Sequence, residues 1–452
     1  MSRRIILLPM PFQGHINPMM QLGSILHSRG FAISIIHTQY NSPDPSKYPH
    51  FTFHPIPDGV SEDSQASKGG DILRVLHLIN TDCVPLFRDC LGKLLSIHDD
   101  IACVITDAII YSSQAVAENL GVKRIALRTS SVCSFLAFAT LPLLREKGFY
   151  SDDTLDSRRE DPVPELPPLK VKDVLGIKIQ NMDVTLKVVC DMVEGTKKAS
   201  GLIFNTFQDL EGSDLANLHD LFRLPTFPIG PFHKFFSAAS SSLLTQDRSS
   251  VSWLDTQTTS SVLYVSFGSL AAMDERDLTE VAWGLANSMQ PFLWAVRPGL
   301  VQGSQWLESL PNGFLEVISE RGYIVKWTPQ QEVLSHPAVG GFWTHSGWNS
   351  ILESVCEGVP MICSSCFGDQ MVNSRYINDV WKLGIKLEDG FKREEIELAI
   401  RKIMLHREGQ EIRGKLLCLK EKIDSASSTS LDALSDFISS LKYSGDYSSA
   451  LV

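Results

Sequence analysis

The chain contains 452 residues, of which 43% are hydrophobic and 21% charged, and its net charge at pH 7 is -11. These proportions are ordinary for a globular protein, and the length exceeds what one hydrophobic core supports, so we expect two domains. The acidic balance disfavours nucleic acid as a partner. No stretch reaches the ~18 apolar residues of a membrane span, and the first strand is too short for a signal peptide, which favours a cytoplasmic protein.

The cysteine pattern argues against both disulfides and a metal site. Nine cysteines are present, most of them single and in apolar surroundings, which indicates reduced, buried thiols. Cys363 and Cys366 form a CxxC pair, but no second pair of ligands stands at the spacing of a zinc site. A redox pair would be expected at the start of a helix in a thioredoxin-like unit. We therefore expect no metal ion and no redox role.

Predicted strands alternate with helices along the chain, which is typical of parallel α/β sheets. In the first half the strands lie near Ile5 and at 32–37, 52–55, 103–106, 123–127 and 201–205. The stretch 150–174, where proline and charged residues cluster, is predicted to be an irregular excursion from this pattern.

The N-terminal segment places a histidine at a sheet edge. It predicts an apolar strand at 5–8, then a loop that contains His15, then a helix from about Pro18. The carboxyl ends of strands are where open α/β sheets bind ligands. Imidazole is largely neutral at physiological pH and can accept a hydroxyl proton, so His15 is a candidate general base. Most histidines in loops are only surface residues, and the loop by itself does not decide.

Two further polar residues follow predicted strands. The segment IACVITDAII predicts a strand that ends in Asp107, whose carboxylate could accept a hydrogen bond from His15 and stabilise the imidazolium. The alternative is a helix N-cap. Thr129 begins a stretch that turns from polar to apolar, and it is either a ligand contact or another N-cap. The apolar residues that follow it, Phe135, Leu136 and Phe138, either line a pocket for the molecule whose hydroxyl reacts, the acceptor, or belong to a core helix.

A second series of strands begins after a polar segment. Residues 237–250 (SAASSSLLTQDRSS) have the composition of an interdomain linker, and the alternative is a long surface loop. Strands are predicted afterwards at 262–267, 292–296, 323–327, 339–343, 361–363 and 384–387, and the chain from Arg393 onward is predicted to be helical.

Residues 327–370 offer the side chains that a nucleotide sugar requires. The indole of Trp327 can stack on a base, a contact of about 1–3 kcal/mol, and the carboxylate of Glu353 can accept from both ribose hydroxyls. The segment VGGFWTHSGWNSILESVCEG predicts a strand, a turn and a helix that begins near Ser346. Free N–H groups at a helix start stabilise a diphosphate, although many such turns merely pack.

Other polar residues surround the same turn and the next helix start. His345, Asn349 and Ser350 are further hydrogen-bond donors at the turn, and the pair Asp369 and Gln370 opens the following helix. Such a pair suits sugar hydroxyls. The sequence thus places a base-stacking group, a ribose acceptor, phosphate donors and sugar contacts within one run.

The whole run WTPQQEVLSHPAVGGFWTHSGWNSILESVCEGVPMICSSCFGDQ resembles the 44-residue PSPG box of plant family 1 glycosyltransferases, and PFQGHINPM resembles their N-terminal motif. The resemblance covers nearly the whole chain. It implies the GT-B fold, an α/β architecture of two facing Rossmann-like domains with parallel sheets. We expect an acceptor-binding domain at 1–236 with the 150–174 excursion near the acceptor, a linker at 237–250, a UDP-sugar domain at 251–436, and a tail at 437–452 that packs back on the first domain.

The resemblance also implies roles for individual residues. His15 is the general base and Asp107 the acid of a His-Asp dyad. The implied donor contacts are Trp327 and the backbone of Gln330 with the base, Glu353 with the ribose, His345, Asn349, Ser350 and Ser269 with the phosphates, and Trp348, Asp369, Gln370 and Thr129 with the sugar. A final Gln is associated with glucose, so the implied donor is UDP-glucose.

Two positions depart from the pattern of the family. Ser346 stands where cysteine is usual, and Ser365 where proline is frequent. Serine is close to cysteine in size and should preserve the turn, whereas the loss of proline is expected to loosen the loop before Asp369.

The implied reaction is direct displacement with inversion, so that an α-linked donor gives a β-glucoside. Helix N–H groups and His345 would neutralise the leaving charge in place of a metal ion. The acceptor would be a small, largely apolar plant metabolite, such as a terpenoid, flavonoid, cytokinin or phenolic or hydroxy acid, and a carboxyl or a ring nitrogen could replace its hydroxyl. We expect no cofactor other than the UDP-glucose co-substrate, and a monomer.

Two other classes of function compete with a glucosyltransferase. A binding protein that keeps the donor box without turnover is disfavoured by the presence of both His15 and Asp107. A different enzyme of similar fold, such as a sugar-nucleotide epimerase or a retaining phosphorylase, is unsupported because the N-terminal motif and the box belong together.

Overall fold

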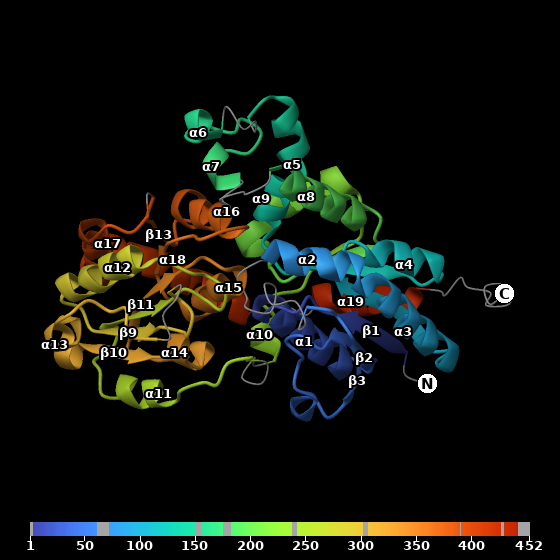
Figure 1. The fold of residues 1–452 in the computed structure, drawn as a ribbon, viewed down its shortest axis with the longest axis horizontal. Helices are drawn as coiled ribbons and strands as arrows, with labels where there is room; N and C mark the ends of the chain where they lie inside the picture. Colours follow the sequence, from blue (N-terminus) through green and yellow to red (C-terminus); the bar gives the residue numbers. More distant parts are fainter. Residues whose placement is uncertain are drawn as a thin grey trace. The chain divides into compact units, whose positions relative to one another are not determined.

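The computed structural model describes residues 3–60, 72–149, 155–174, 182–236, 242–301, 306–388, 390–425 and 429–441. The chain divides into two compact units, each built on its own parallel sheet (Figure 1). Unit 1 comprises Met1–Pro142, Ile179–Leu243 and Ser427–Val452, and unit 2 comprises Leu143–Lys178 and Leu244–Ala426. The chain passes between the units after Leu243, inside the segment predicted as a linker.

Unit 1 contains a seven-stranded sheet in the order β3-β2-β1-β4-β5-β6-β7. The strands are β1 (Arg4–Leu8), β2 (Ala32–Thr38), β3 (Phe51–Ile56), β4 (Ile101–Asp107), β5 (Arg124–Arg128), β6 (Gly201–Phe204) and β7 (Thr226–Pro228). The helices are α1 (Gln13–Ser28), α2 (Ile72–Thr81), α3 (Cys83–Ile97), α4 (Ser113–Asn119), α5 (Val132–Glu146), α8 (Met182–Lys197), α9 (Gln208–Phe222), α10 (Phe232–Phe235) and α19 (Thr429–Ser440), with a 3-10 turn at Pro45–Lys47. α5 continues across the boundary of the unit.

Unit 2 contains a six-stranded sheet in the order β10-β9-β8-β11-β12-β13. The strands are β8 (Val262–Ser266), β9 (Phe292–Ala295), β10 (Gly322–Val325), β11 (Val339–Thr344), β12 (Met361–Cys363) and β13 (Gly384–Lys386). The helices are α6 (Leu155–Arg158), α7 (Val171–Val174), α11 (Ser249–Leu254), α12 (Glu275–Ser288), α13 (Phe314–Ile318), α14 (Gln330–Ser335), α15 (Trp348–Glu357), α16 (Gln370–Arg375), α17 (Arg393–Leu405) and α18 (Arg407–Asp424). A 3-10 turn lies at Ser319–Arg321, and a π-helical turn at Tyr376–Val380 continues α16.

The central strands of both sheets are mostly apolar, because helices cover both faces of a parallel sheet. Every residue of β4, β5, β8 and β11 is buried. This burial leaves only the carboxyl ends of the strands, and the loops that follow them, for polar chemistry. The prediction of a GT-B fold with two Rossmann-like parallel sheets agrees with this topology.

The described part of the C-terminal segment packs on unit 1, and its helix α19 begins at Thr429, before the expected domain boundary at 436. Leu431, Leu434 and Ile438 of α19 join the core beneath β1 and β4, and the ring centroid of Phe437 lies 5.1 Å from that of Phe227. The guanidinium of Arg3 donates to the Ile438, Ser439 and Leu441 carbonyls at 2.8–2.9 Å, where a cation favours a helix end. Residues 442–452 lie outside the described part of the chain.

The structure differs from the predicted elements at several points. α1 begins at Gln13, after an extended Phe12, and contains Pro18 in its interior, so His15 lies in the first helical turn and not in a loop. α15 begins at Trp348, which leaves His345 and Ser346 in the turn before it. The 150–174 excursion contains α6 and α7, and its described part packs within unit 2 instead of the predicted first domain.

Candidate functional site

In unit 1 the sheet topology gathers three of the predicted site residues. His15 follows β1, Asp107 ends β4 and Thr129 follows β5, and these three strands are neighbours in the sheet. The strand order reverses direction between β1 and β4, which is the switch point where open α/β sheets bind ligands.

The geometry of this cluster is that of an oriented base. His15 Nδ1 lies 2.6 Å from Asp107 Oδ2 and 2.9 Å from Thr129 Oγ1. The Asp107 side chain is 1% exposed, and its other oxygen, Oδ1, accepts the Ile109 N–H at 3.0 Å. The His15 side chain is 21% exposed. A fixed carboxylate on Nδ1 directs the proton to that nitrogen and leaves Nε2 as the acceptor that a general base needs.

The capping alternatives for Asp107 and Thr129 do not hold. The N-cap of α4 is Ser112. At the start of α5, the Ser131 hydroxyl accepts the Ser134 N–H at 3.2 Å, which is the contact of a capping residue. The apolar residues that follow serve the core, because Phe135 and Leu136 are buried within a cluster of unit 1 and Phe138 packs against it.

In unit 2 the same kind of sheet edge carries the second set of predicted residues. Ser269 follows β8, His345 follows β11 and the loop before Asp369 follows β12, and these three strands are again neighbours. The order reverses between β8 and β11. Thr129, predicted with the donor contacts, lies instead with the unit 1 cluster.

The imidazole of His345 is held between two glycines. A Cβ built on Gly268 would lie 2.6 Å from the ring, and one built on Gly347 would also collide with it. Only glycine fits at either position. Gly268 has φ +73°, a left-handed backbone conformation that further favours glycine.

Burial keeps His345 neutral. It lowers the pKa of His345 to about 4, against a hydrogen bond with the Ser266 backbone that raises it. A histidine with this pKa is neutral at pH 7 and carries a single N–H, which its hydrogen bond to the Ser266 backbone uses, and the expectation that His345 neutralises charge stays a prediction. Its Nδ1 is buried and has no hydrogen-bond partner among the described residues. Such an atom costs about 1–3 kcal/mol unless a ligand satisfies it.

The turn after β11 depends on Ser346 and on a residue that the sequence analysis did not single out. Ser346 is fully buried with φ +67°, and its N–H donates to Thr344 Oγ1 at 3.1 Å. The side-chain amide of Asn373 donates to the Ser346 carbonyl and to Asp369 Oδ2, both at 3.1 Å. Asn373 therefore joins the predicted phosphate turn to the predicted sugar pair, and no sequence pattern indicated this long-range contact.

Glu353 is held by two glutamine amides. Gln330 Nε2 donates to Oε2 at 2.7 Å and Gln331 Nε2 to Oε1 at 3.0 Å. Burial raises the pKa of Glu353, and these hydrogen bonds oppose that rise. Gln330 also donates to the Ser350 hydroxyl at 2.9 Å, so the structure brings together three predicted donor contacts at the starts of α14 and α15.

The loop before α16 is closed by hydrogen bonds in place of the missing proline. Ser365 Oγ donates to the Gln370 carbonyl at 2.8 Å. The side-chain oxygen of Gln370 accepts the backbone N–H groups of Cys366 at 2.9 Å and Phe367 at 3.2 Å. These contacts occupy the side-chain oxygen of Gln370 and leave its amide nitrogen as the donor for the predicted sugar hydroxyl.

The remaining predicted residues lie along the same unit. Trp327 is half-buried after β10, and its carbonyl accepts the Asp247 N–H at 2.8 Å. Trp348 is 3% exposed and packs at 6.0 Å from Trp381. Ser269 and Asn349 are half-buried. Ser269 has no described hydrogen bond to the other predicted residues.

A further cation lies beside the turn after β8. Arg297, just past the end of β9, donates through Nε to the Gly268 carbonyl at 3.2 Å and through its other nitrogens to the Ala271 and Pro298 carbonyls. Burial lowers its pKa. Hydrogen bonds to three backbone carbonyls hold this cation next to Gly268, the glycine that packs against His345. No sequence pattern indicated Arg297 as a site residue.

Neither a metal cluster nor a membrane span is found in the part of the chain that the structure describes. No group of three or more His, Cys, Asp or Glu side chains is arranged to hold a metal ion there. No helix within the described ranges has the length and apolarity to cross a bilayer.

Two parallel Rossmann-like sheets, each with polar residues at its switch point, are the architecture of the GT-B fold, and solved glycosyltransferases share it. A Phytolacca americana glycosyltransferase, UGT2, solved with UDP-2-fluoro-glucose and pterostilbene, superposes with a TM-score of 0.81 over 97% of this chain and 99% of its own, at 28% identity. A UDP-glucose:anthocyanidin 3-O-glucosyltransferase in complex with UDP gives a TM-score of 0.83 over 97% and 99%, at 25% identity.

Sequence comparison identifies the family. The family model described as "UDP-glucoronosyl and UDP-glucosyl transferase" matches residues 238–412. The chain is 49% identical to UDP-glycosyltransferase 76B1 of Arabidopsis thaliana, over 93% of both chains. It is 46% identical to UDP-glycosyltransferase 76G1 of Stevia rebaudiana, over 97% of both. The chain belongs to the plant family 1 UDP-glycosyltransferases, as its two motifs predict.

Proposed function

We propose that the protein transfers glucose from UDP-glucose to a hydroxyl of a small, largely apolar plant metabolite, with inversion to a β-glucoside. The observation that carries the proposal is the 2.6 Å contact between His15 and Asp107 at the switch point of unit 1. A non-catalytic nucleotide-sugar binder has no need of a base whose tautomer is fixed in this way.

In this mechanism His15 Nε2 takes the proton of the acceptor hydroxyl as the hydroxyl oxygen attacks the anomeric carbon. The bond from that carbon to the UDP oxygen breaks, and the charge passes to the diphosphate. The imidazolium that forms is stabilised by Asp107. The departing diphosphate is bound by N–H groups at the start of α15 and by His345, with the nearby charge of Arg297.

The remaining roles follow the arrangement in unit 2. Trp327 stacks on uracil with the Gln330 backbone beside it, Glu353 accepts from the ribose, and Ser269, Asn349 and Ser350 contact the phosphates. Trp348, Asp369 and Gln370 contact the sugar, with Thr129 as a further contact from unit 1. Glucose as the donor sugar is supported by Gln370 at the end of the box and by the names of structural neighbours that bind UDP-2-fluoro-glucose or use UDP-glucose. We further propose a cytoplasmic enzyme that needs no metal ion.

The proposed acceptor is small and largely apolar. One structural neighbour was solved with pterostilbene, and another is named as capable of glucosylating indoxyl. Both compounds are small and largely apolar. Apolar pockets discriminate weakly, by roughly 1–3 kcal/mol per methylene, so we expect several acceptors to be used.

The test is UDP release from purified protein supplied with UDP-glucose and a panel of terpenoid, flavonoid, cytokinin, and phenolic or hydroxy-acid acceptors. His15→Ala should reduce release about 10²–10⁴-fold while UDP still binds. His219→Ala, an exposed histidine on α9, is the matched control and should be as active as the wild type.

The other possible results would lead to different conclusions. Undiminished activity of His15→Ala would overturn the base assignment. Tight UDP-glucose binding without release on any acceptor would favour a binding protein. Product formed only on purine nitrogens would identify an N-glucosyltransferase of cytokinin-like compounds.

A further inference from the structure

A carboxylate with no exposed surface lies far in sequence from the donor residues but within the same unit. Asp173 ends the 155–174 excursion, on α7, and is 0% exposed. Its Oδ2 accepts from Arg375 Nε at 2.9 Å and from the Lys170 N–H at 3.0 Å. Its Oδ1 accepts from Lys386 Nζ at 2.6 Å and from a terminal nitrogen of Arg375 at 3.3 Å. A buried carboxylate with every lone pair satisfied is an ordered structural element.

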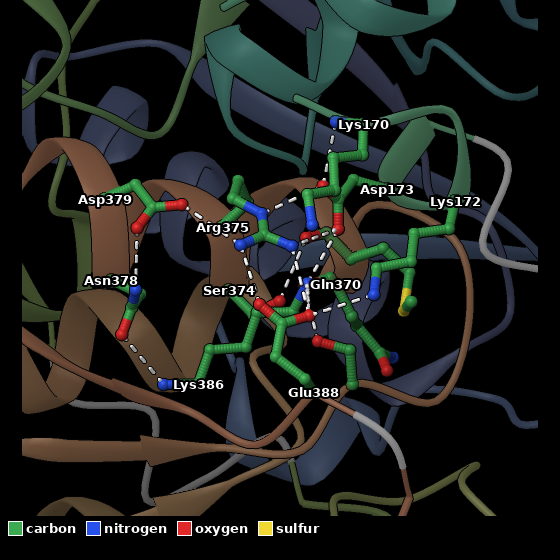
Figure 2. Close-up of polar contacts among 12 residues, drawn as sticks. Lys170, Lys172, Asp173, Gln370, Ser374, Arg375, Asn378, Asp379, Lys386 and Glu388 are labelled. Carbon is green, nitrogen blue, oxygen red and sulfur yellow. Dashed lines mark hydrogen bonds and ion pairs between the residues drawn. The ribbon is translucent and has the colours of Figure 1, made fainter. Parts of the chain in front are cut away.

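These contacts extend into an alternating charge network, which Figure 2 shows with the side chains pointing toward one another. Glu388 accepts from Arg375 at 2.7 and 3.1 Å and lies 3.2 Å from Lys172 and 3.4 Å from Lys386. Its remaining members are Lys170 and Glu160 at one end and Asp379 at the other. The network thus contains four carboxylates and four cations, so its charges balance.

The strength of the network appears in the pKa values of its members. Burial alone would raise the pKa of Glu388, but hydrogen bonds from Arg375 and the charges of Lys386 and Arg375 lower it to about 2. For Arg375, the effect of burial is likewise outweighed by its bonds to Asp173 and Glu388, which raise its pKa. Both groups are therefore charged at pH 7.

Arg375 is the last residue of α16, whose first residue is Gln370. Between them, Asn373 donates to the Ser346 carbonyl and to Asp369. The π-helical turn Tyr376–Val380 follows directly, and its Asn378 accepts the N–H of Lys386 at 3.1 Å. Any shift of Arg375 along or across the helix axis therefore moves Gln370, Asp369 and the contact to the phosphate turn together.

We propose that Arg375, clamped by Asp173 of the excursion, is a positioning residue for the donor sugar, because it fixes the short helix that presents Asp369 and Gln370. The inference rests on the proposed role of those two residues in binding the sugar. It assigns a function to the 155–174 excursion, which lies outside the donor box. Arg375 lies in the same helical segment as Gln370, directly before the π-helical turn, so a side chain locked at this point sets where the first turn of α16 lies.

The experiment measures the dissociation constants of UDP and of UDP-glucose by calorimetry on the full chain without acceptor, for Asp173→Asn and for Glu388→Gln. Asp173→Asn should weaken UDP-glucose binding roughly tenfold, as a misplaced contact does, and should leave UDP binding within about twofold. Glu388→Gln, whose side chain is 36% exposed, should act in the same direction by a smaller factor and carries the test if Asp173→Asn does not fold. Glu280→Gln, which breaks the Arg393 pair between α12 and α17, is the matched control and should change neither constant.

A Gln370→Ala variant separates this inference from the function on which it rests. If Gln370→Ala leaves the ratio of the two constants unchanged, the proposed sugar contact is wrong, whatever Asp173 does. If Gln370→Ala changes the ratio and neither network variant does, the sugar contact stands and the positioning role is overturned. Equal weakening of UDP and UDP-glucose in the network variants would also overturn it, because it would indicate a general loss of structure.

The double variant Asp173→Asn/Gln370→Ala gives the decisive comparison. If Asp173 acts through α16, its replacement should add little to the loss already caused by Gln370→Ala, so the two effects should be non-additive. Full multiplication of the two effects would contradict a common route.

Discussion

At the scale of single residues, the role proposed for His15 depends on the side chains that contact it. His15 and Asp107 lie 92 positions apart in sequence and 2.6 Å apart in space. The carboxylate is immobilised by burial and by the Ile109 N–H, so it can hold only one tautomer of the imidazole.

Replacement of Asp107 by Asn should therefore reduce kcat by about 10²–10⁴-fold with little change in UDP affinity. An amide that donates to Nδ1 moves the imidazole proton to Nε2, where it blocks acceptance of the hydroxyl proton. Steady-state kinetics with a good acceptor, together with calorimetry for UDP, would measure both. Asp432→Asn, at an exposed position on α19, is the control, and a kcat near wild type in Asp107→Asn would refute the tautomer argument.

The space around His345 leads to a second prediction. Gly347 has an ordinary backbone conformation at φ -66°, so alanine is excluded there by the clash with the His345 ring and not by backbone strain. Overpacking of this kind costs about 1–3 kcal/mol. Gly347→Ala should weaken UDP binding by a comparable amount, roughly tenfold or more. In Gly414→Ala the new methyl group meets no atom within 4 Å, and UDP binding should be unchanged. Equal UDP affinity in both variants would show that His345 is not needed where it stands.

At the scale of elements, we expect the stability of α19 to depend on its packing against the core of unit 1. Leu434 is fully buried against the core of unit 1. Leu434→Ala should lower stability by about 2–5 kcal/mol, the range for a buried leucine. Leu398→Ala on α17, where the side chain is 52% exposed, should have little effect. Denaturant midpoints would compare them, and equal midpoints would contradict the packing of α19.

The charge network makes stability depend on pH in a definite window. The folded-state pKa of Glu388 is about 2, below its ordinary value of 4.5. A group with a depressed pKa stabilises the fold above its unfolded pKa, and that contribution is lost as pH falls from about 4.5 through about 2. The urea midpoint of Glu388→Gln should lie below that of the wild type at pH 6 and approach it at pH 2.5. Glu316→Gln, exposed on α13, is the control. A midpoint difference that persists at pH 2.5 would show that the effect is not ionic.

At the scale of the whole molecule, both units place function in the same way. Each sheet reverses its strand order once near its centre, between β1 and β4 or between β8 and β11, and the polar residues follow the strands on either side. The preference of open α/β sheets to bind ligands at the switch point therefore accounts for the position of the proposed base in unit 1 and of the proposed nucleotide contacts in unit 2.

We predict a monomer, because the exposed large apolar side chains of the described residues are distributed over many elements, among them Ile97 on α3, Leu221 on α9 and Leu405 on α17. Single apolar residues of this kind are normal at a protein surface and give no reason to expect association. Light scattering should give a mass near 50.2 kDa at every concentration. A stable mass twice as large would contradict this.

Much of the molecule was determined by local sequence. Apolar runs fixed nearly all strands to within a residue or two, and the two motifs identified the family, because buried parallel strands and nucleotide cradles each need particular residue types at short spacing. Helix starts were less certain. Proline is commonest in a first turn, so Pro18 indicated a helix start, whereas the structure extends α1 back to Gln13.

Only the tertiary structure decided which residues act together. The pairing of Asp107 with His15, the neutral state of His345, the bridge through Asn373 and the buried partners of Asp173 all depend on contacts between segments separated by many residues. The residue types at the end of each predicted strand can be read directly from the sequence. Burial and distance decide their charge and their partners, and these are set by how the strands are ordered in the sheet and by which helices cover it.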